Sequence, residues 1–215
     1  MEPSKHHIRL REDFTKGTLS ENEVEKFPSK QFEIWIAEAI EAQIKETHAM
    51  NLSTVSPDGK PSSRIVYLRE FGNDQFTFYG NYHSKKAKHI EKNPNVSLHF
   101  FWPDLERQIR IEGMVVKCSA QESDAYFDNR PYESKLSAWA SDQSDELTSR
   151  AELEKKVEEF RKKYSEKDIK RPQHWGGWTV QANYYEFWQG RKSRLHDRIV
   201  YVLEDSSWKI KRLSP

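Results

Sequence analysis

Hydrophobic residues near the start of the chain recur at the spacing of a helix. Apolar side chains fall three or four positions apart at Phe32, Trp35, Ile36, Ala39 and Ile40. This spacing predicts an amphipathic helix, and Ser29 is placed to cap its first turn. The preceding residues are polar and show no period. We therefore expect a mobile N-terminal arm and linker over residues 1–28, followed by a single folded domain over residues 29–215.

After this helix the hydrophobic period changes to two, as in a strand that buries one of its faces. Strands are predicted at residues 50–55, 63–68, 75–79, 96–102 and 107–116. Turn residues separate most of them, and Ser84 is placed to cap a short helix over residues 85–91. Short strands at this spacing are typical of an antiparallel barrel or sandwich.

A helical block and a second group of strands complete the chain. Ser119 and Glu122 have the spacing of a capping box at the start of one helix. A charged segment carries one apolar stripe, at Leu153, Val157, Phe160 and Tyr164. We expect this segment to form a helix that packs on the barrel as a lid. Strands are predicted again at residues 175–178, 183–188, 198–203 and 208–213. The predicted class is mainly β with helices (α+β).

The span from Phe187 to Arg198 gathers an aromatic pair, a glycine and several ionisable side chains. Gly190 can take backbone angles that a side chain forbids, so we expect a reversal between two strands there. In the second strand Arg194, His196 and Arg198 would share one face, because alternate residues point the same way. Two guanidiniums beside an imidazole need an anionic or planar partner. A solvated edge strand with ordinary charges is the alternative.

Composition restricts the partners that the chain can bind. Lys and Arg number 35 against 34 Asp and Glu, and the formal net charge of +1 gives no general attraction to nucleic acid or to an anionic membrane. The single cysteine, Cys118, excludes an internal disulfide, and no apolar run approaches the ~18 residues of a membrane span. The polar start has no apolar export segment. We expect a cytoplasmic protein without nucleic-acid or membrane partners.

The content of aromatic residues suggests how so polar a chain can form a core. Hydrophobic residues make up only 35% of the chain, yet it contains 7 Trp, 9 Tyr and 11 Phe. Each aromatic side chain buries about 150–250 Å², so a few of them can cover much area. Aromatic residues are also enriched where subunits meet. One hypothesis is therefore a core that is completed across a subunit interface.

The sequence lacks the familiar catalytic motifs, and its indication of function comes from a set of basic residues. The glycine-rich dinucleotide loop, the phosphate loop and the His-Glu-x-x-His zinc motif are absent, and no metal site is predicted. Basic residues occur where predicted strands begin or end, at Arg64, Arg69, Lys85, Lys86, Arg130, Arg194 and Arg198. Their charge-assisted hydrogen bonds suit a phosphorylated small molecule, while ordinary solvated charges are the alternative. Arg64 and Arg69 can serve one pocket only if their strand bends, bulges or ends before Arg69.

These residues lie in motifs that resemble the pyridoxine/pyridoxamine 5′-phosphate oxidase family. The resemblance runs from about Leu10 to Pro215 and rests on several motifs in family order. They are residues 64–68, 84–87, 107–108, 126–134, 138–144, 175–177, 186–190 and 194–198. The resemblance implies an antiparallel split β-barrel that binds FMN and forms a homodimer with FMN in the subunit interface.

The resemblance also implies a role for individual residues. FMN would be held by Arg64, Ile65, Val66, Tyr67, Leu68, Arg69, Tyr79, Gly80, Lys85, Lys86, Gln108, Gln143, Ser144, Trp188 and Arg198. The substrate would be held by Arg11, Arg69, Tyr126, Arg130, Ser134, Arg194, Leu195 and His196. Arg194 and His196 would be the catalytic residues, lying over the pyridine ring of the substrate. A guanidinium suits this place because it stacks on an aromatic face while it stays charged.

The implied activity is the oxidation of pyridoxine 5′-phosphate and pyridoxamine 5′-phosphate to pyridoxal 5′-phosphate. A hydride would pass from C4′ of the substrate to N5 of the flavin, and O2 would reoxidise the flavin to H2O2, with ammonia released from the amine. His196 could bond the ring hydroxyl or shuttle a proton. The alternatives are a split-barrel flavoprotein oxidoreductase with another substrate, and a noncatalytic carrier of flavin or pyridoxal phosphate.

The chain departs from the family pattern at a few positions. Arg69 stands where the family usually has lysine, which keeps the cation but changes its reach. Phe14 stands where a tyrosine is expected, so the N-terminal arm lacks that hydroxyl. Gly80 and Ser137 replace a frequent threonine and a common glycine. These changes bear on substrate affinity more than on FMN binding.

Overall fold

An antiparallel sheet forms the body of the computed structural model, which describes residues 13–215. Its strands are β1 (Ala49–Val55), β2 (Pro61–Tyr67), β3 (Glu70–Gly72), β4 (Gln75–Asn81), β5 (Asn95–Trp102), β6 (Arg107–Lys117), β7 (Trp175–Gln189), β8 (Asp197–Glu204) and β9 (Ser207–Arg212). The helices are α1 (Pro28–Glu41), α2 (Lys85–Lys92), α3 (Ala120–Asp128), α4 (Tyr132–Ala140) and α5 (Arg150–Lys163). The strand order is β2-β1-β5-β6-β7-β4-β3, and β8 and β9 continue the sheet from β7.

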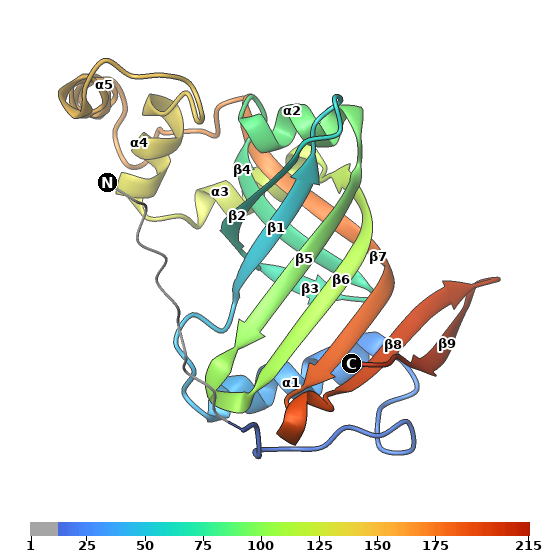
Figure 1. Cartoon of the computed structure of the whole chain (residues 1–215). Coiled ribbons are helices and arrows are strands. Elements are labelled where there is room, and N and C mark those ends of the chain that lie inside the picture. Colours follow the sequence, from blue (N-terminus) through green and yellow to red (C-terminus); the bar gives the residue numbers. More distant parts are fainter. Residues whose placement is uncertain (1–12) are drawn as a thin grey trace, which may run out of the picture.

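The sheet curls so that its two ends approach each other, with β1, β5 and β6 on one side and β3 and β4 behind them (Figure 1). The backbone N–H of Arg69, just past β2, donates to the carbonyl of Thr77 in β4 at 2.9 Å. β7 is long enough to pair with β4 and β6 in the barrel and with β8 beyond it. The predicted antiparallel barrel with attached helices is confirmed.

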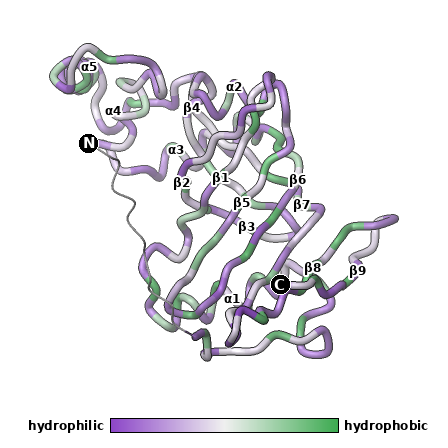
Figure 2. The backbone as a smooth tube through the Cα atoms, in the orientation of Figure 1, coloured by the Kyte–Doolittle hydropathy of each residue, from purple (hydrophilic) through white to green (hydrophobic). Residues whose placement is uncertain are grey.

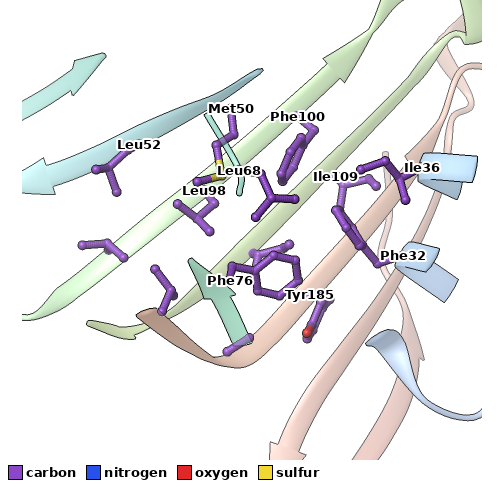
Figure 3. Packing of buried hydrophobic residues seen from close by; sticks show 14 of the residues in the cluster. Phe32, Ile36, Met50, Leu52, Leu68, Phe76, Leu98, Phe100, Ile109 and Tyr185 are labelled. Atoms are coloured by element: carbon purple, nitrogen blue, oxygen red, sulfur yellow. The ribbon is translucent and has the colours of Figure 1, made fainter. Parts of the chain in front are cut away.

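Large aromatic side chains fill the barrel, as the composition suggests. Inward-facing residues of neighbouring strands meet in rows, such as Leu52 of β1 opposite Leu98 of β5. From α1, the buried Phe32 enters one end of the barrel, where its ring lies edge to face with Phe76 at 5.0 Å and with Phe100 at 5.3 Å (Figure 3). Figure 2 shows hydrophobic and hydrophilic residues interspersed along the strands, as this alternation requires.

Two of the three serines expected to cap helices, Ser29 and Ser84, accept no capping hydrogen bond. α1 begins at Pro28, so Ser29 lies inside the first turn and caps nothing. Proline is favoured at a helix start because its φ is already helical and it lacks the N–H that would stay unpaired. Ser84 is the N-cap residue of α2 as expected, but its hydroxyl donates to the carbonyl of Asn81 at 2.7 Å and accepts no backbone N–H of the helix. The two helices themselves lie where the pattern predicts them.

The sequence pattern misses two elements. α3 starts with the predicted capping box of Ser119 and Glu122, and Pro131 follows its end. Pro131 is also the N-cap of α4. The proline therefore marks the start of a second helix, whereas the sequence pattern indicates only the end of the first. β3 has three residues, which is too short for a period to show.

The expectation that α5 covers the barrel as a lid is wrong. Its apolar stripe packs on α4, where the Trp139 ring lies 5.6 Å from Phe160 and 5.1 Å from Tyr164. Figure 1 shows α5 outside α4 and away from the strands. A narrow stripe can be covered by one aromatic neighbour, so the pattern alone does not choose its partner. No helix within residues 13–215 combines the length and apolar character needed to cross a lipid bilayer.

Residues 13–27 pack against the barrel in this structure. Leu19 is buried, and the Lys16 N–H donates to the carboxylate of Glu106 at 2.9 Å. These contacts fix the segment that the sequence assigns to a linker, because turn residues of the barrel supply acceptors for its backbone. The rest of the predicted arm, including Arg11, lies outside the described residues.

Candidate active site

A cavity of about 580 Å³ lies along β2, between this strand, the start of α2 and the end of α3. Its lining residues are Ser62, Ser63, Arg64, Ile65, Val66, Tyr67, Arg69, Tyr79, Lys85, Lys86, Tyr126, Arg130, Gln143 and Ser144. Most of the residues that the sequence assigns to FMN or to the substrate phosphate are therefore brought together here. Their parts in binding remain predictions.

The cavity is strongly basic. Its cations are Arg64, Arg69, Lys85, Lys86 and Arg130, and no carboxylate lies among the lining residues. Burial lowers the pKa of Arg64, and burial together with the charge of Arg69 lowers the pKa of Arg130. Since desolvation and repulsion both disfavour the charged forms, an anion in the cavity would stabilise all of these groups.

Lys86 is the most buried of these cations. Its ammonium donates to Ser84 Oγ at 2.9 Å and to Gln143 Oε1 at 2.5 Å. Burial, followed by the charge of Arg64, lowers the pKa of Lys86 to about 8. The side chain is thus largely charged at neutral pH and becomes neutral under mildly alkaline conditions.

Aromatic rings line the side of the cavity next to Arg130. The rings of Tyr79 and Tyr126 stack with centroids 3.7 Å apart, and the Arg130 guanidinium lies 4.4 Å from the centre of the Trp175 ring. Nη2 of Arg130 donates to the carbonyl of Ser134 at 2.9 Å. Its buried Nε has no hydrogen-bond partner in the described part of the chain. An unpaired buried donor is costly, so this edge of the guanidinium favours an acceptor from a ligand.

Arg64 and Arg69 reach the same cavity because β2 ends before Arg69, which is one of the arrangements expected from the sequence. Three further predicted residues are close to the lining residues but do not line the cavity themselves. Leu68 is buried in the core, and Ser134 contributes its carbonyl to Arg130. Gly80 lies beside Lys86, since a Cβ at this glycine would come within 3.1 Å of the lysine Nζ.

Gln108, Trp188 and Arg198 form a second group on the outer face of the sheet. They are direct neighbours in one row across β6, β7 and β8. Nε of Arg198 donates to Glu186 Oε1 at 2.7 Å, and Gln108 Oε1 lies 2.8 Å from His99 Nε2. Figure 1 shows β8 and the turn before it at the opposite end of the molecule from α2 and α3. In one chain the predicted site residues are thus divided between two places.

The prediction that Arg194, His196 and Arg198 alternate along one strand is wrong. Lys192–Arg194 forms a 3₁₀ turn, and β8 begins only at Asp197. Ser193 and Arg194 have φ of 55° and 62°, which no strand residue adopts. Arg194 and His196 therefore belong to the turn that precedes the strand, and Leu195 between them is 70% exposed.

Position 190 needs a glycine because there is no room for a side chain, and its backbone angles are not unusual. Among the described glycines, only Gly59 and Gly72 have positive φ. A Cβ at Gly190 would come within 2.7 Å of the Phe14 ring and 3.0 Å of Glu106 Cβ. The expected reversal follows this residue, but its angles are ones that other residues can adopt. Gly190 instead lets residue 14 pack beside the turn.

His196 is held by an aromatic pair and by one backbone donor. Its ring lies 4.6 Å from Trp188 and 5.6 Å from Phe14, and the N–H of Arg191 donates to its Nδ1 at 3.1 Å. Partial burial and the charge of Arg194 lower the pKa of His196. Because Nδ1 accepts this bond, the proton of the neutral ring is on Nε2.

The carboxylate of Asp197 joins three separate segments beside this turn. It accepts the N–H of Leu19 at 3.1 Å, Nη1 of Arg191 at 2.7 Å and Nη1 of Arg212 at 2.8 Å. Arg212 also pairs with Glu21 at 2.6 Å. The turn with Arg194 and His196 is thereby attached to the N-terminal segment and to β9.

Sequence reasoning misses some residues of the cavity. Ser62 and Ser63 line it, and Trp175 lies behind Arg130. Ser62 has the same parity in β2 as Arg64, so the alternation of the strand could have identified it. Trp175 offers no such signal, because only the packing of α3 and α4 against β7 brings it to Arg130.

Comparisons with known proteins identify the family of the chain. Residues 36–164 match the family model described as pyridoxamine 5′-phosphate oxidase, and residues 175–215 match the pyridoxine 5′-phosphate oxidase C-terminal dimerisation region. A pyridoxine/pyridoxamine 5′-phosphate oxidase of Trichormus variabilis is 49% identical over 207 residues, which cover 96% of this chain and 97% of the relative. The protein of the same name from Cytophaga hutchinsonii is 49% identical over 208 residues, with the same coverage.

The fold is also shared with a solved structure. PhzG from Burkholderia lata, in complex with tetrahydrophenazine-1-carboxylic acid, has a TM-score of 0.85 and 27% identity, and the match covers 90% of this chain and 95% of that one. The dimerisation region covers β7, β8, β9 and the turn before β8, and it therefore includes Trp188, His196 and Arg198. The chain belongs to the pyridoxine/pyridoxamine 5′-phosphate oxidase family.

Proposed function

We propose that this protein oxidises pyridoxine 5′-phosphate and pyridoxamine 5′-phosphate to pyridoxal 5′-phosphate, with FMN as cofactor and O2 as acceptor. The observation that carries the proposal is the cavity beside α2, which brings five cations together without a carboxylate. Two phosphorylated molecules, the cofactor and the substrate, would account for so many cations in one place. The products are H2O2 and, from the amine, ammonia.

The cations divide by position into two groups. Arg64 of β2 and Lys85 and Lys86 of α2 would hold the FMN phosphate, with Gln143 and Ser144 beside them. The first turn of α2 adds backbone N–H groups that favour an anion. Arg69 and Arg130, with Tyr126 and Ser134, would hold the substrate phosphate. The unpaired Nε of Arg130 supports this assignment, because it offers a buried donor.

A complete site would need a second copy of the chain. Trp188, Arg194, His196 and Arg198 do not line the cavity of their own chain, and all four lie within the family's dimerisation region, residues 175–215. Figure 1 shows β8 and the turn before it far from α2. Exposed apolar side chains, Ile65 at 63% and Phe101 at 59%, belong to the same outer face of the sheet. We propose that a homodimer covers them and brings these groups of one copy to the cavity of the other.

In such a dimer the residues of this chain bind, orient and exclude water. Arg194 would lie over the pyridine ring and hold it in place. His196 presents Nε2, with its proton fixed there by the Arg191 N–H, so it can donate to the ring hydroxyl. When bound, FMN supplies the two-electron chemistry, taking a hydride from the substrate and returning the electrons to O2.

Flavin affinity is expected to fall as pH rises through about 8, the pKa of Lys86. Below this pH the ammonium is charged and attracts the phosphate, and above it the neutral amine loses a charge-assisted bond. That loss corresponds to roughly tenfold in affinity. Quenching of FMN fluorescence between pH 7 and 9.5 measures the change. The Lys86→Met variant should bind weakly with a flat profile, and an equally steep profile in the variant would assign the titration to another group.

Purified protein should be yellow and should consume O2 with both phosphorylated substrates. Oxygen uptake, formation of pyridoxal 5′-phosphate and the flavin spectrum are measured together, with pyridoxine and pyridoxamine that lack the phosphate as matched controls. A colourless protein that takes up no FMN would refute the proposal. A yellow protein that is inert toward both substrates would favour the split-barrel oxidoreductase of other specificity or the noncatalytic carrier.

A further inference from the structure

We propose that Thr54 and His89 are positioning residues that hold the Arg64 guanidinium ready for a phosphate. The inference rests on the proposed function, in which Arg64 binds the phosphate of FMN. Neither residue lines the cavity, and neither belongs to the motifs that the sequence singles out. Thr54 bonds Arg64 directly, and His89 is connected to Arg64 through Thr54.

The guanidinium of Arg64 is fixed on one side only. Its Nη1 donates to the carbonyl of Leu52 and to Oγ1 of Thr54, each at 2.9 Å, and its Nη2 donates to Oγ of Ser62 at 2.6 Å. A guanidinium has five N–H groups. Within residues 13–215 these three bonds leave the Nε hydrogen and one Nη2 hydrogen without a protein acceptor. Arg64 is therefore oriented by the protein and still has donors for a ligand.

Thr54 connects this guanidinium to α2. The residues Thr54 and His89 are 1% and 7% exposed. The Thr54 hydroxyl accepts from Arg64 and lies 3.2 Å from Nδ1 of His89. The hydroxyl has one proton and two acceptors within reach, His89 Nδ1 at 3.2 Å and the carbonyl of Ser62 at 3.4 Å. We assign the proton to the nearer, His89 nitrogen, since the hydroxyl oxygen already accepts from a cation. Such a series of bonds strengthens each member, because every donor is polarised by the next.

The hydrogen bonds from His89 through Thr54 to Arg64 connect the two elements that carry the cations of the anion site. Thr54 lies opposite Ser62 in the pairing of β1 with β2, and His89 lies one turn after Lys85 and Lys86 in α2. The bonds from His89 through Thr54 thus join the strand that carries Arg64 to the helix that carries the two lysines. A shift of either element would separate the cations that are proposed to hold one phosphate.

The test compares FMN with riboflavin, which lacks the phosphate. Thr54→Val keeps the shape of the side chain and removes the hydroxyl. In full-length protein freed of flavin, its FMN affinity is expected to fall about tenfold while its riboflavin affinity stays unchanged. His89→Leu should lower FMN affinity about threefold in the same selective way. Thr54→Ser restores the hydroxyl and should recover the wild-type preference for FMN. All titrations are run well below the melting temperature of each variant.

The outcomes separate the two proposals. Wild-type protein that binds FMN no better than riboflavin would refute the assigned phosphate site, and the positioning role with it. Wild-type protein that prefers FMN, with variants that keep this preference or lose both ligands equally, would refute the positioning role alone. Should Thr54→Val fail to fold, Thr54→Ala and His89→Leu provide the same comparison.

Discussion

A mixture of the Arg64→Ala and Arg194→Ala variants, each nearly inactive alone, is expected to regain about a quarter of the wild-type turnover. Arg64 lies in the cavity beside α2, whereas Arg194 lies in the turn before β8. If each site combines the cavity of one copy with the turn of the other, a mixed dimer has one site that lacks both arginines and one site that has both. Random exchange makes half of the dimers mixed, which gives the expected fraction.

The matched control combines two changes within the same cavity. Arg64→Ala mixed with Arg130→Ala should remain inactive, because both sites of the mixed dimer then lack one cavity residue. Exchange of subunits is verified with two differently tagged copies, and Arg194→Ala alone should retain bound FMN. If the first mixture stays inactive although the subunits exchange, the turn of each chain serves its own cavity and the two-copy site is wrong.

Phe32→Ala is expected to lower the free energy of unfolding by about 3–5 kcal/mol. The ring is completely buried and lies edge to face with Phe71, Phe76 and Phe100 at the end of the barrel. Removing it leaves a cavity that the surrounding strands cannot close, because they are fixed by their hydrogen bonds. Urea unfolding of the flavin-free protein measures the loss at one fixed protein concentration.

Ile40→Ala in the same helix is the matched control. Ile40 is 61% exposed in one chain, so its truncation should change the free energy of unfolding by less than about 1 kcal/mol. Equal losses for the two variants would mean that α1 acts through its helical stability and does not seal the barrel. A loss confined to Phe32→Ala supports the described core.

Much of the fold follows from the hydrophobic period of the sequence. The change from helical spacing at α1 to alternation in β1, β2, β5 and β6 places these elements within a few residues of their observed ends. The partner of α5 could not be predicted. The apolar stripe that includes Phe160 indicates only that some apolar surface covers it, and does not indicate which one. Tertiary packing, here by Trp139, makes that choice.

The candidate site was predictable for a different reason. The prediction of the cavity residues rests on motifs that resemble those of the family. The structure brings most of these residues together. Simple alternation fails for Arg194 and His196, because a tight turn with positive φ replaces the strand there. Thr54 and His89 have no local signal at all. Their relation to Arg64 depends on the register of β1 with β2 and on where α2 lies.

The carboxylate of Asp197 has a consequence for how related sequences change. It is shared by Leu19, Arg191 and Arg212, and Arg212 in turn pairs with Glu21. Loss of Asp197 leaves Arg191 without its counterion, and loss of Arg212 leaves Glu21 without one, although positions 21 and 212 are far apart in the chain. Among relatives, substitutions at these positions should therefore occur together. The turn before β8 is then expected to co-vary with the segment around Glu21 and with β9.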